Sequence, residues 1–212
     1  MKKIIDLSHI YDEKLTKYDN EDVALFKQTK FYEAHGYKET NINIDTHVGT
    51  HMDAPSHIFS GYKNVDELEI ENFVGKALII RVKNEGEMGE DILKNYEKEL
   101  SNIDFIVFNT GWDRYWGEKR YYEHPYLSLN LAKKISEYSN IKAVGIDTFS
   151  VDKYGDPFLE VHKTLLRSNK IYIMENLCNI DEISKEIVEI ICLPLKIKGI
   201  DGGPVRVIAI EE

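Results

Sequence analysis

The sequence predicts an α/β domain in which a mixed sheet is covered on most of its surface, and it leaves open whether that sheet closes into a barrel. Short runs rich in β-branched and apolar residues recur along the whole chain and outnumber the segments with helical spacing. Several of these runs are apolar almost throughout, which is typical of strands that are buried on both faces. These two observations carry the prediction.

The expected strands are short and are separated by turn-forming or helical segments. They lie at residues 3–7, 42–47, 77–82, 105–108, 143–146, 171–174, 187–193 and 205–210. The pattern does not predict their order in the sheet.

Three segments between these strands have apolar residues spaced three and four apart, which is the period of an amphipathic helix. They are residues 91–100, 129–138 and 159–168. Ser128 is placed to cap the second helix, and Ser101 follows the first. Residues 84–90, rich in glycine and glutamate, are predicted to form a solvated loop. Because no linker or repeat interrupts the chain, we expect residues 1–212 to form a single domain.

The composition excludes several classes of partner. A hydrophobic content of 42% over 212 residues is enough for a sizeable core. A formal net charge of −10 argues against nucleic acid, because binding a phosphate backbone requires a concentrated basic surface. No apolar run is long enough to span a bilayer, the start of the chain lacks the apolar region of a signal peptide, and two cysteines are too few for a disulfide framework. We therefore expect a cytoplasmic protein that binds neither nucleic acid nor membrane.

The most informative segment runs from His47 to His57 and reads HVGTHMDAPSH. A shuffled chain of this composition would contain roughly 0.0005 copies of such a cluster of three histidines and an aspartate. Imidazole nitrogen and carboxylate oxygen without thiolate suit zinc, manganese, iron or cobalt in a catalytic role better than a closed structural zinc site. The segment therefore predicts a catalytic metal centre.

The local sequence favours an extended, bent backbone for this segment. His47 and His51 could share one face of a helix, but residues 48–50 are poor helix formers and Pro55 follows. In an extended chain His47, His51 and Asp53 point to one side. The α-carbons of the two histidines would then lie about 13 Å apart, which is too far for one ion. We therefore expect the chain to bend at Gly49, whose missing Cβ permits positive φ and close passage beside an ion.

Asp53 is the member of this cluster that can bridge two ions, because its two carboxylate oxygens can bind separately. A second ion would need ligands from elsewhere in the chain. His162, on an expected helix, and Glu175, at the end of an expected strand, are the best distant candidates. Spacing alone favours an ordinary helix-surface histidine and a solvated strand end for this pair. Spacing also assigns surface or hydrogen-bonded roles to His9, His35 and His124. For Asp147 and Ser150 it leaves two alternatives open, a turn-forming role and a position near the site.

The chain resembles the cyclase family of metal-dependent hydrolases, which includes bacterial kynurenine formamidases and isatin hydrolase. The resemblance covers nearly the whole chain. It is carried by Ile5–His9, His47–His57, Asn109–Trp112, Gly145–Asp152, His162–Leu177 and Leu193–Arg206.

This resemblance implies two divalent metal ions per subunit, with zinc favoured and manganese as the alternative. His47, His51 and Asp53 would hold one ion, and Asp53 would bridge to a second ion held by His162 and Glu175. His57 would be the catalytic proton donor and acceptor. The resemblance further implies the swivelling β/β/α fold of the family and a homo-oligomer, either a dimer or a tetramer.

The implied reaction is hydrolysis of a small amide, either an aryl formamide such as that of tryptophan catabolism or a cyclic amide, by metal-bound hydroxide. Formamidases of the family carry an aromatic residue followed by Pro-Gly-Asp, whereas residues 15–22 read LTKYDNED. Tyr18 retains the aromatic position and is predicted to contact the substrate. A lactonase or dehydrating cyclase would use the same metals, and a non-catalytic metal-dependent binding module would not need His57.

Overall fold

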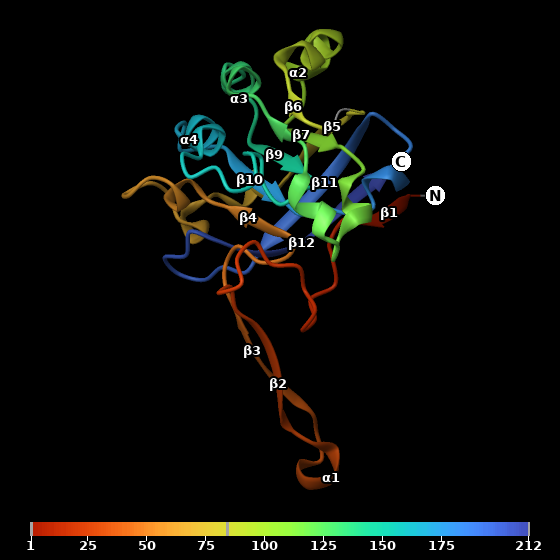
Figure 1. Cartoon of the computed structure of the whole chain (residues 1–212), viewed down its shortest axis with the longest axis vertical. Helices are drawn as coiled ribbons and strands as arrows, with labels where there is room; N and C mark the ends of the chain where they lie inside the picture. Colours follow the sequence, from red (N-terminus) through yellow and green to blue (C-terminus); the bar gives the residue numbers. More distant parts are fainter. Residues whose placement is uncertain (1, 84, 212) are drawn as a thin grey trace.

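The computed structural model describes residues 2–83 and 85–211. Within this part of the chain, seven strands form a closed ring in the order β12, β11, β5, β7, β9, β10, β4, and β4 pairs again with β12 (Figure 1). An eighth strand, β1, extends the sheet beside the far end of β12. The strands are β1 (Lys3–Asp6), β4 (His51–Asp53), β5 (Val74–Arg81), β7 (Phe105–Asn109), β9 (Ala143–Ile146), β10 (Tyr172–Glu175), β11 (Ile187–Pro194) and β12 (Gly202–Glu211).

The ring is a mixed sheet. The four strands β5, β7, β9 and β10 are parallel, and the pairings made by β1, β4, β11 and β12 are antiparallel. The predicted α/β class with a mixed, covered sheet is confirmed, and the sheet is closed.

Alternation along the strands divides the core into two layers, because successive side chains of a strand point to opposite faces. On β5 and β7, Ile79 and Val107 pack inside the ring, whereas Ile80 and Phe108 pack on its outer face. All of these side chains are buried. Burial on both faces explains why the sequences of the parallel strands are apolar throughout.

Helices cover the outer face of the parallel strands (Figure 1). The predicted helix at 129–138 is α3 (Leu129–Ser136), and Ser128 caps it by accepting a hydrogen bond from the backbone of Leu131. The predicted helix at 159–168 is α4 (Glu160–Leu166). The prediction of one α-helix at 91–100 is wrong, because a 3-10 helix, η4 (Glu90–Tyr96), occupies most of it and only α2 (Glu97–Leu100) is α-helical. Both parts still bury a leucine, so helical spacing gives the correct buried face and does not distinguish the two helix types.

A long hairpin of β2 (Ala24–Lys30) and β3 (Glu39–Ile44) extends away from the ring, and α1 (Tyr32–His35) lies at its tip (Figure 1). The prediction of a strand at 42–47 is wrong in its boundaries, because β3 ends at Ile44 and His47 lies in a turn. β2 was not predicted, since its sequence ALFKQTK lacks a sustained apolar run. Leu25, Phe31 and Ile42 of the hairpin are exposed.

Two further strands form a separate pair, β6 (Glu87–Met88) and β8 (Tyr126–Leu127). β6 lies within the predicted loop 84–90, so that prediction is wrong at residues 87–88, while residue 84 lies outside the described residues. No helix in the described ranges has the length and apolar character needed to cross a membrane. The remaining 3-10 helices are η1 (Pro55–His57), η2 (Val65–Glu67), η3 (Ile70–Phe73), η5 (Trp112–Tyr115), η6 (Lys119–Glu123) and η7 (Ile180–Glu182).

Candidate metal centre

Strand β4 brings the first two predicted ligands to the same side of the sheet. His51 and Asp53 are two residues apart on an extended strand, so their side chains share a face. On the neighbouring strand β10, Glu175 lies directly opposite His51. Opposed residues of an antiparallel pair project to the same face, and the three side chains therefore converge.

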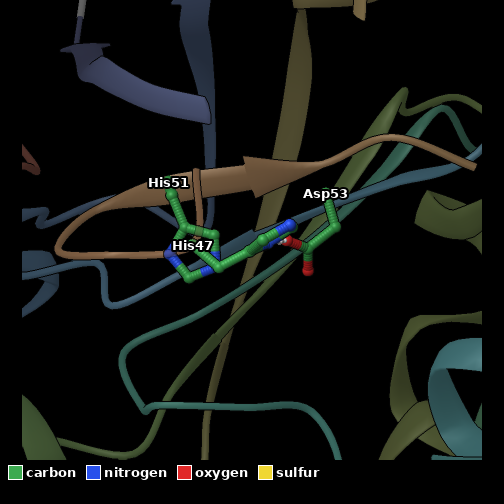
Figure 2. A group of neighbouring side chains, drawn as sticks. All are labelled: His47, His51 and Asp53. Atoms are coloured by element: carbon green, nitrogen blue, oxygen red, sulfur yellow. Dashed lines mark hydrogen bonds and ion pairs between the residues drawn. The ribbon is translucent and has the colours of Figure 1, made fainter. Parts of the chain in front are cut away.

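His47 reaches the same place by a turn. As the predicted bend requires, residues 46–50 form turns and bends, and only residues 51–53 are strand. Nδ1 of His47 lies 2.6 Å from Oδ1 of Asp53 (Figure 2). Nε2 of His51 lies 3.3 Å from the same oxygen. One carboxylate oxygen is thus faced by both imidazoles.

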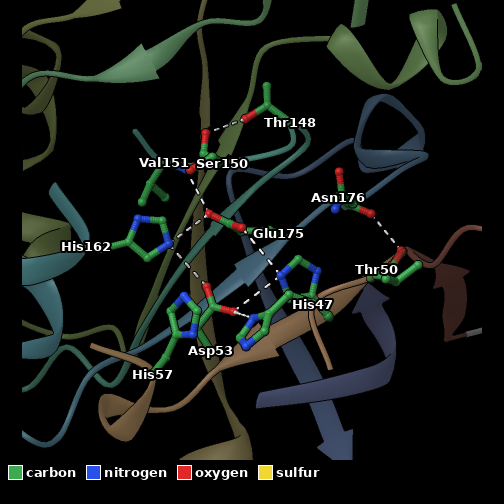
Figure 3. A network of polar contacts seen from close by, with 12 residues as sticks. His47, Thr50, Asp53, His57, Thr148, Ser150, Val151, His162, Glu175 and Asn176 are labelled. Atoms are coloured by element: carbon green, nitrogen blue, oxygen red, sulfur yellow. Dashed lines mark hydrogen bonds and ion pairs between the residues drawn. The ribbon is translucent and has the colours of Figure 1, made fainter. Parts of the chain in front are cut away.

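The second oxygen of Asp53 faces the distant pair of predicted ligands. Oδ2 of Asp53 lies 3.3 Å from Nε2 of His162, and that nitrogen lies 3.4 Å from Oε1 of Glu175 (Figure 3). His162 comes from α4 and is buried, so it is not the helix-surface histidine that spacing favoured. Glu175 is also buried and is not a solvated strand end.

These residues fit a metal in number, type and placement. His47, His51 and Asp53 form one group, and Asp53, His162 and Glu175 form another, each with its donor atoms within 4.8 Å of one another. Oδ2 of Asp53 is buried and accepts no hydrogen bond, although His162 lies beside it. A buried carboxylate oxygen without a donor is costly unless a cation binds it.

The electrostatics of the cluster also favour bound cations. Burial lowers the pKa of His47 and of His51, but the charge of Asp53 and hydrogen bonds to carboxylates outweigh burial and raise the pKa to about 9 and about 10, respectively. Burial raises the pKa of Asp53, yet the charges of His51 and His47 hold it well below its usual value. The pocket thus retains positive charge around its carboxylates, and a metal ion would replace those protons.

The second nitrogen of each candidate histidine ligand is held by an oxygen outside the cluster. Nδ1 of His162 lies 2.6 Å from Asp152, Nε2 of His47 lies 2.8 Å from Asp201, and Nδ1 of His51 lies 2.8 Å from the carbonyl of Gly49. Such contacts fix the tautomer and the orientation of a metal-ligating imidazole. Asp152 also accepts from the first backbone N–H groups of α4, which ties the helix start to the histidine.

Asp201 is the functional residue that sequence reasoning missed. It precedes β12 and lies 154 residues from His47 in sequence, and its Oδ2 contacts Nε2 of His47 and Nδ1 of His57. The hydrogen bonds of both histidines hold the pKa of Asp201 well below its usual value. In the sequence, the signal for Asp201 was its position directly before the glycine pair Gly202-Gly203. The structure explains the first glycine, because a Cβ on Gly202 would lie 2.6 Å from the ring of His47.

We expect Asp201→Asn to weaken zinc binding about 10- to 100-fold, the usual range for loss of an outer carboxylate that orients a metal-ligating histidine. Isothermal titration of metal-free protein with zinc measures this change. Asp91→Asn removes an exposed carboxylate outside the cluster and serves as the control. Unchanged zinc affinity in Asp201→Asn would show that His47 needs no such support.

His57 stands beside the candidate ligands and is partly exposed. It belongs to the short helix η1, its ring centroid lies 4.0 Å from that of His47, and its Nδ1 lies 3.1 Å from Asp201. The structure gives its Nε2 no hydrogen-bond partner among the described residues. His47, His57 and Asp201 also form a third group able to hold an ion, so geometry alone admits a ligand role for His57 as well.

The bend expected at Gly49 is present, with φ of +68°. Its close neighbour is a tyrosine ring, because a Cβ on Gly49 would lie 2.6 Å from Cζ of Tyr11. The hydroxyl of Tyr11 donates to the carbonyl of Thr50 and lies 3.0 Å from the carbonyl of Val48, and these contacts hold the turn before His51. Glycine is therefore required here for both backbone conformation and space.

Gly49→Ala is expected to lower the melting temperature more than Gly61→Ala does. Both glycines have positive φ, which costs a side chain about 1–2 kcal/mol, but nothing lies within 4 Å of a Cβ at Gly61. The difference in melting temperature between the two variants measures the clash with Tyr11, and Gly49→Ala should also bind less metal. Equal melting temperatures and full metal content in both variants would contradict this account of the turn.

A pocket of about 460 Å³ opens over the cluster. The candidate ligands and His57 line one end, and Tyr18, Phe149 and Leu159 are among the residues lining the rest. Tyr18, which was predicted to contact the substrate, is thus a lining residue of this pocket. Ser150 lines the pocket as well.

The remaining histidines and Asp147 do not line the pocket, and the structure gives them packing, surface or turn-forming roles. His9 is stacked on Trp116 with a centroid distance of 3.9 Å, and His124 is buried and contacts the carbonyl of Pro125. His35 is exposed at the tip of the hairpin. The Asp147 carboxylate accepts from Thr110 and from the backbone of residue 112, so it holds a turn.

Comparison with known proteins agrees with the fold and the cluster. The sequence pattern of a family described as "Putative cyclase" matches residues 5–153. The chain is 29% identical to "Cyclase-like protein 3" of Oryza sativa subsp. japonica, over 99% of this chain and 80% of the relative. It is 32% identical to a protein named kynurenine formamidase from Bacillus cereus (strain ZK / E33L), over 89% of this chain and 92% of the relative.

A solved structure shares the architecture. Isatin hydrolase A from Ralstonia solanacearum superposes with a TM-score of 0.86, at 23% identity, over 100% of this chain and 92% of that chain. The fold is therefore that of the isatin hydrolases.

Proposed function

This chain belongs to the cyclase family, and from that membership we propose that it is a metal-dependent hydrolase that cleaves the carbon–nitrogen bond of a small amide. The observation that carries the proposal is the placement of the Asp53 carboxylate, which faces two imidazoles with one oxygen and a third imidazole with the other, at one end of a pocket. An aryl formamide is the first candidate substrate, because the Bacillus cereus relative is named a kynurenine formamidase.

We propose that His47, His51 and Asp53 hold one divalent ion and that Asp53, His162 and Glu175 hold a second, with zinc favoured and manganese as the alternative. When bound, the ions would activate water and polarise the amide carbonyl. The absence of thiolate from the donor set supports a catalytic centre over a structural one.

Within this proposal His57 moves the proton. Its Nδ1 lies against the Asp201 carboxylate, which favours the tautomer with hydrogen on Nδ1 and leaves Nε2 as the atom that exchanges a proton. The ring lines the pocket and is partly exposed, so Nε2 can reach the leaving nitrogen of an amide bound there. His57 would therefore accept on Nε2 the proton released by the attacking water and donate it to the leaving nitrogen as the carbon–nitrogen bond breaks, and Asp201 would hold the ring in place.

Removal of metal is expected to abolish hydrolysis of a formanilide, and addition of zinc or manganese is expected to restore it. The measurement combines metal analysis of the purified protein with turnover of N-formylkynurenine, formanilide, a cyclic amide and a lactone before and after chelation. Turnover of the lactone alone would favour the lactonase. Full turnover by demonstrably metal-free protein would contradict the proposal.

A further inference from the structure

The pocket over the metal cluster has a second end that is built from two loops. Residues 18–22 form one loop and residues 154–159 the other. The backbone N–H of Gly155 donates to the hydroxyl of Tyr18 at 2.9 Å, and the hydroxyl of Tyr154 donates to the carbonyl of Tyr18 at 3.1 Å. The Tyr18 ring also meets Phe149 edge to face, with a centroid distance of 5.9 Å. Hydrogen bonds thus join the two loops, and Tyr18 and Phe149 form an aromatic wall of the pocket.

The charged side chains at this second end are both acidic. Asp22 and Asp156 line the pocket, one from each loop. Oδ2 of Asp22 accepts from the backbone of residue 19, and Oδ1 of Asp156 accepts from the backbone of Phe158. The other oxygen of each carboxylate has no hydrogen bond, and neither group forms an ion pair with a described residue. Two aspartates thus line the pocket, and neither has a cationic partner among the described residues.

Among the described residues, no lysine or arginine lines this pocket, and its basic side chains are the four histidines at the metal cluster. Lys17 is adjacent in sequence to the lining residue Tyr18, and Lys153 lies two residues before Gly155, but neither lysine lines the pocket. Independently of the acidic pair, the cavity has the character of a ligand site, because the unpartnered oxygen of Asp53 is buried at its other end. A ligand bound there would extend from the metal cluster toward the aromatic wall and the two aspartates.

We propose that Asp22 and Asp156 determine specificity among aryl formamides, and that the natural substrate carries a neutral or positively charged group, and no carboxylate, at the end remote from the scissile amide. This would distinguish it from N-formylkynurenine, which carries a carboxylate at that end. This inference rests on the proposed function, because it assumes that the amide is placed at the metal cluster. A carboxylate at the remote end would lie beside two like charges and find no basic side chain. An ammonium group would meet both carboxylates and the faces of aromatic rings, which also attract cations.

The test compares formanilides that differ only in a para substituent on a methylene spacer, which keeps electronic effects on the leaving aniline small. The substituents are trimethylammonium, tert-butyl and carboxylate. For the metal-loaded wild type we expect kcat/KM for the cationic substrate to exceed that for the anionic substrate by roughly tenfold, as two partly exposed charges allow. In the double variant Asp22→Asn/Asp156→Asn this ratio should fall close to one. Glu21→Gln removes an exposed carboxylate adjacent in sequence but outside the pocket lining, and it should leave the ratio unchanged.

A binding measurement keeps the inference separate from the proposed function. Benzyltrimethylammonium does not coordinate metals, and its Kd for the metal-loaded protein should rise severalfold in the double variant and stay constant in Glu21→Gln. Absence of any formanilide turnover together with this shift in Kd would overturn the proposed function alone. An unchanged Kd in the double variant, or a wild-type preference for the carboxylate substrate, would overturn the role of the two aspartates.

Discussion

Replacement of Asp53 by alanine is expected to empty the metal centre completely and to abolish hydrolysis. Both oxygens of this carboxylate are involved, since Oδ1 faces His47 and His51 and Oδ2 faces His162. Loss of any one histidine would leave one of the two groups intact, whereas loss of Asp53 breaks both. Metal content of the purified variant, measured after dialysis against a defined zinc concentration, checks this result.

Two comparisons make the Asp53 result specific. Asp91→Ala removes an exposed carboxylate and should retain full metal content. His51→Ala should retain part of the metal, because Asp53, His162 and Glu175 remain together. Circular dichroism separates loss of metal from loss of fold. A folded Asp53→Ala protein with two ions per subunit would rule out the bridging role.

His57→Ala is expected to bind metal normally and to lose turnover by about 10²- to 10⁴-fold, the usual contribution of a positioned proton donor. The His57 ring lies beside His47, and its Nδ1 contacts Asp201. Neither contact involves Nε2, which is therefore available to exchange a proton. Removing the ring therefore takes away a proton carrier without removing a donor atom of either Asp53 group. Single-turnover rates and metal content measured on the same sample give the two quantities.

The alternative for His57 is metal ligation together with His47 and Asp201. If His57 is a ligand, metal content and turnover will fall together in His57→Ala, and added zinc will restore turnover. If His57 only moves protons, added zinc will have no effect. His35→Ala, at the exposed tip of the hairpin, is the control for loss of a histidine and should change neither quantity.

Sequence pattern predicted the parts of the fold that depend on local apolar spacing. The parallel strands and helices α3 and α4 were found at nearly their observed positions because a continuously buried strand or one apolar helix face leaves a clear period. β4 was missed because it is three residues long, and it is extended only because β10 and β12 pair with it on both sides. Tertiary pairing of this kind leaves no local signal.

The residues of the candidate site also differ in how far they could be predicted from the sequence. His47, His51 and Asp53 are visible in the sequence because they lie close together in the chain. His162 and Glu175 were connected to them by resemblance alone, and Asp201 was not found at all. A carboxylate that supports a histidine 154 residues away follows no spacing rule, since only closure of the sheet brings β12 beside β4. The supporting residues of a site are therefore harder to predict than its ligands.

The position of β4 in the ring links local opening of the sheet to metal binding. β4 is the strand that closes the ring, its partners on the two sides are β10 and β12, and it carries His51 and Asp53. Detachment of these three residues would at once open the sheet and disperse the donor atoms. A ligand that binds only the intact centre stabilises the closed form by mass action, so amide hydrogen exchange at Met52 and across β12 should slow as metal is added. The free energy of detaching β4 and the metal occupancy of the centre are thus linked, so that hydrogen exchange and metal titration report the same equilibrium.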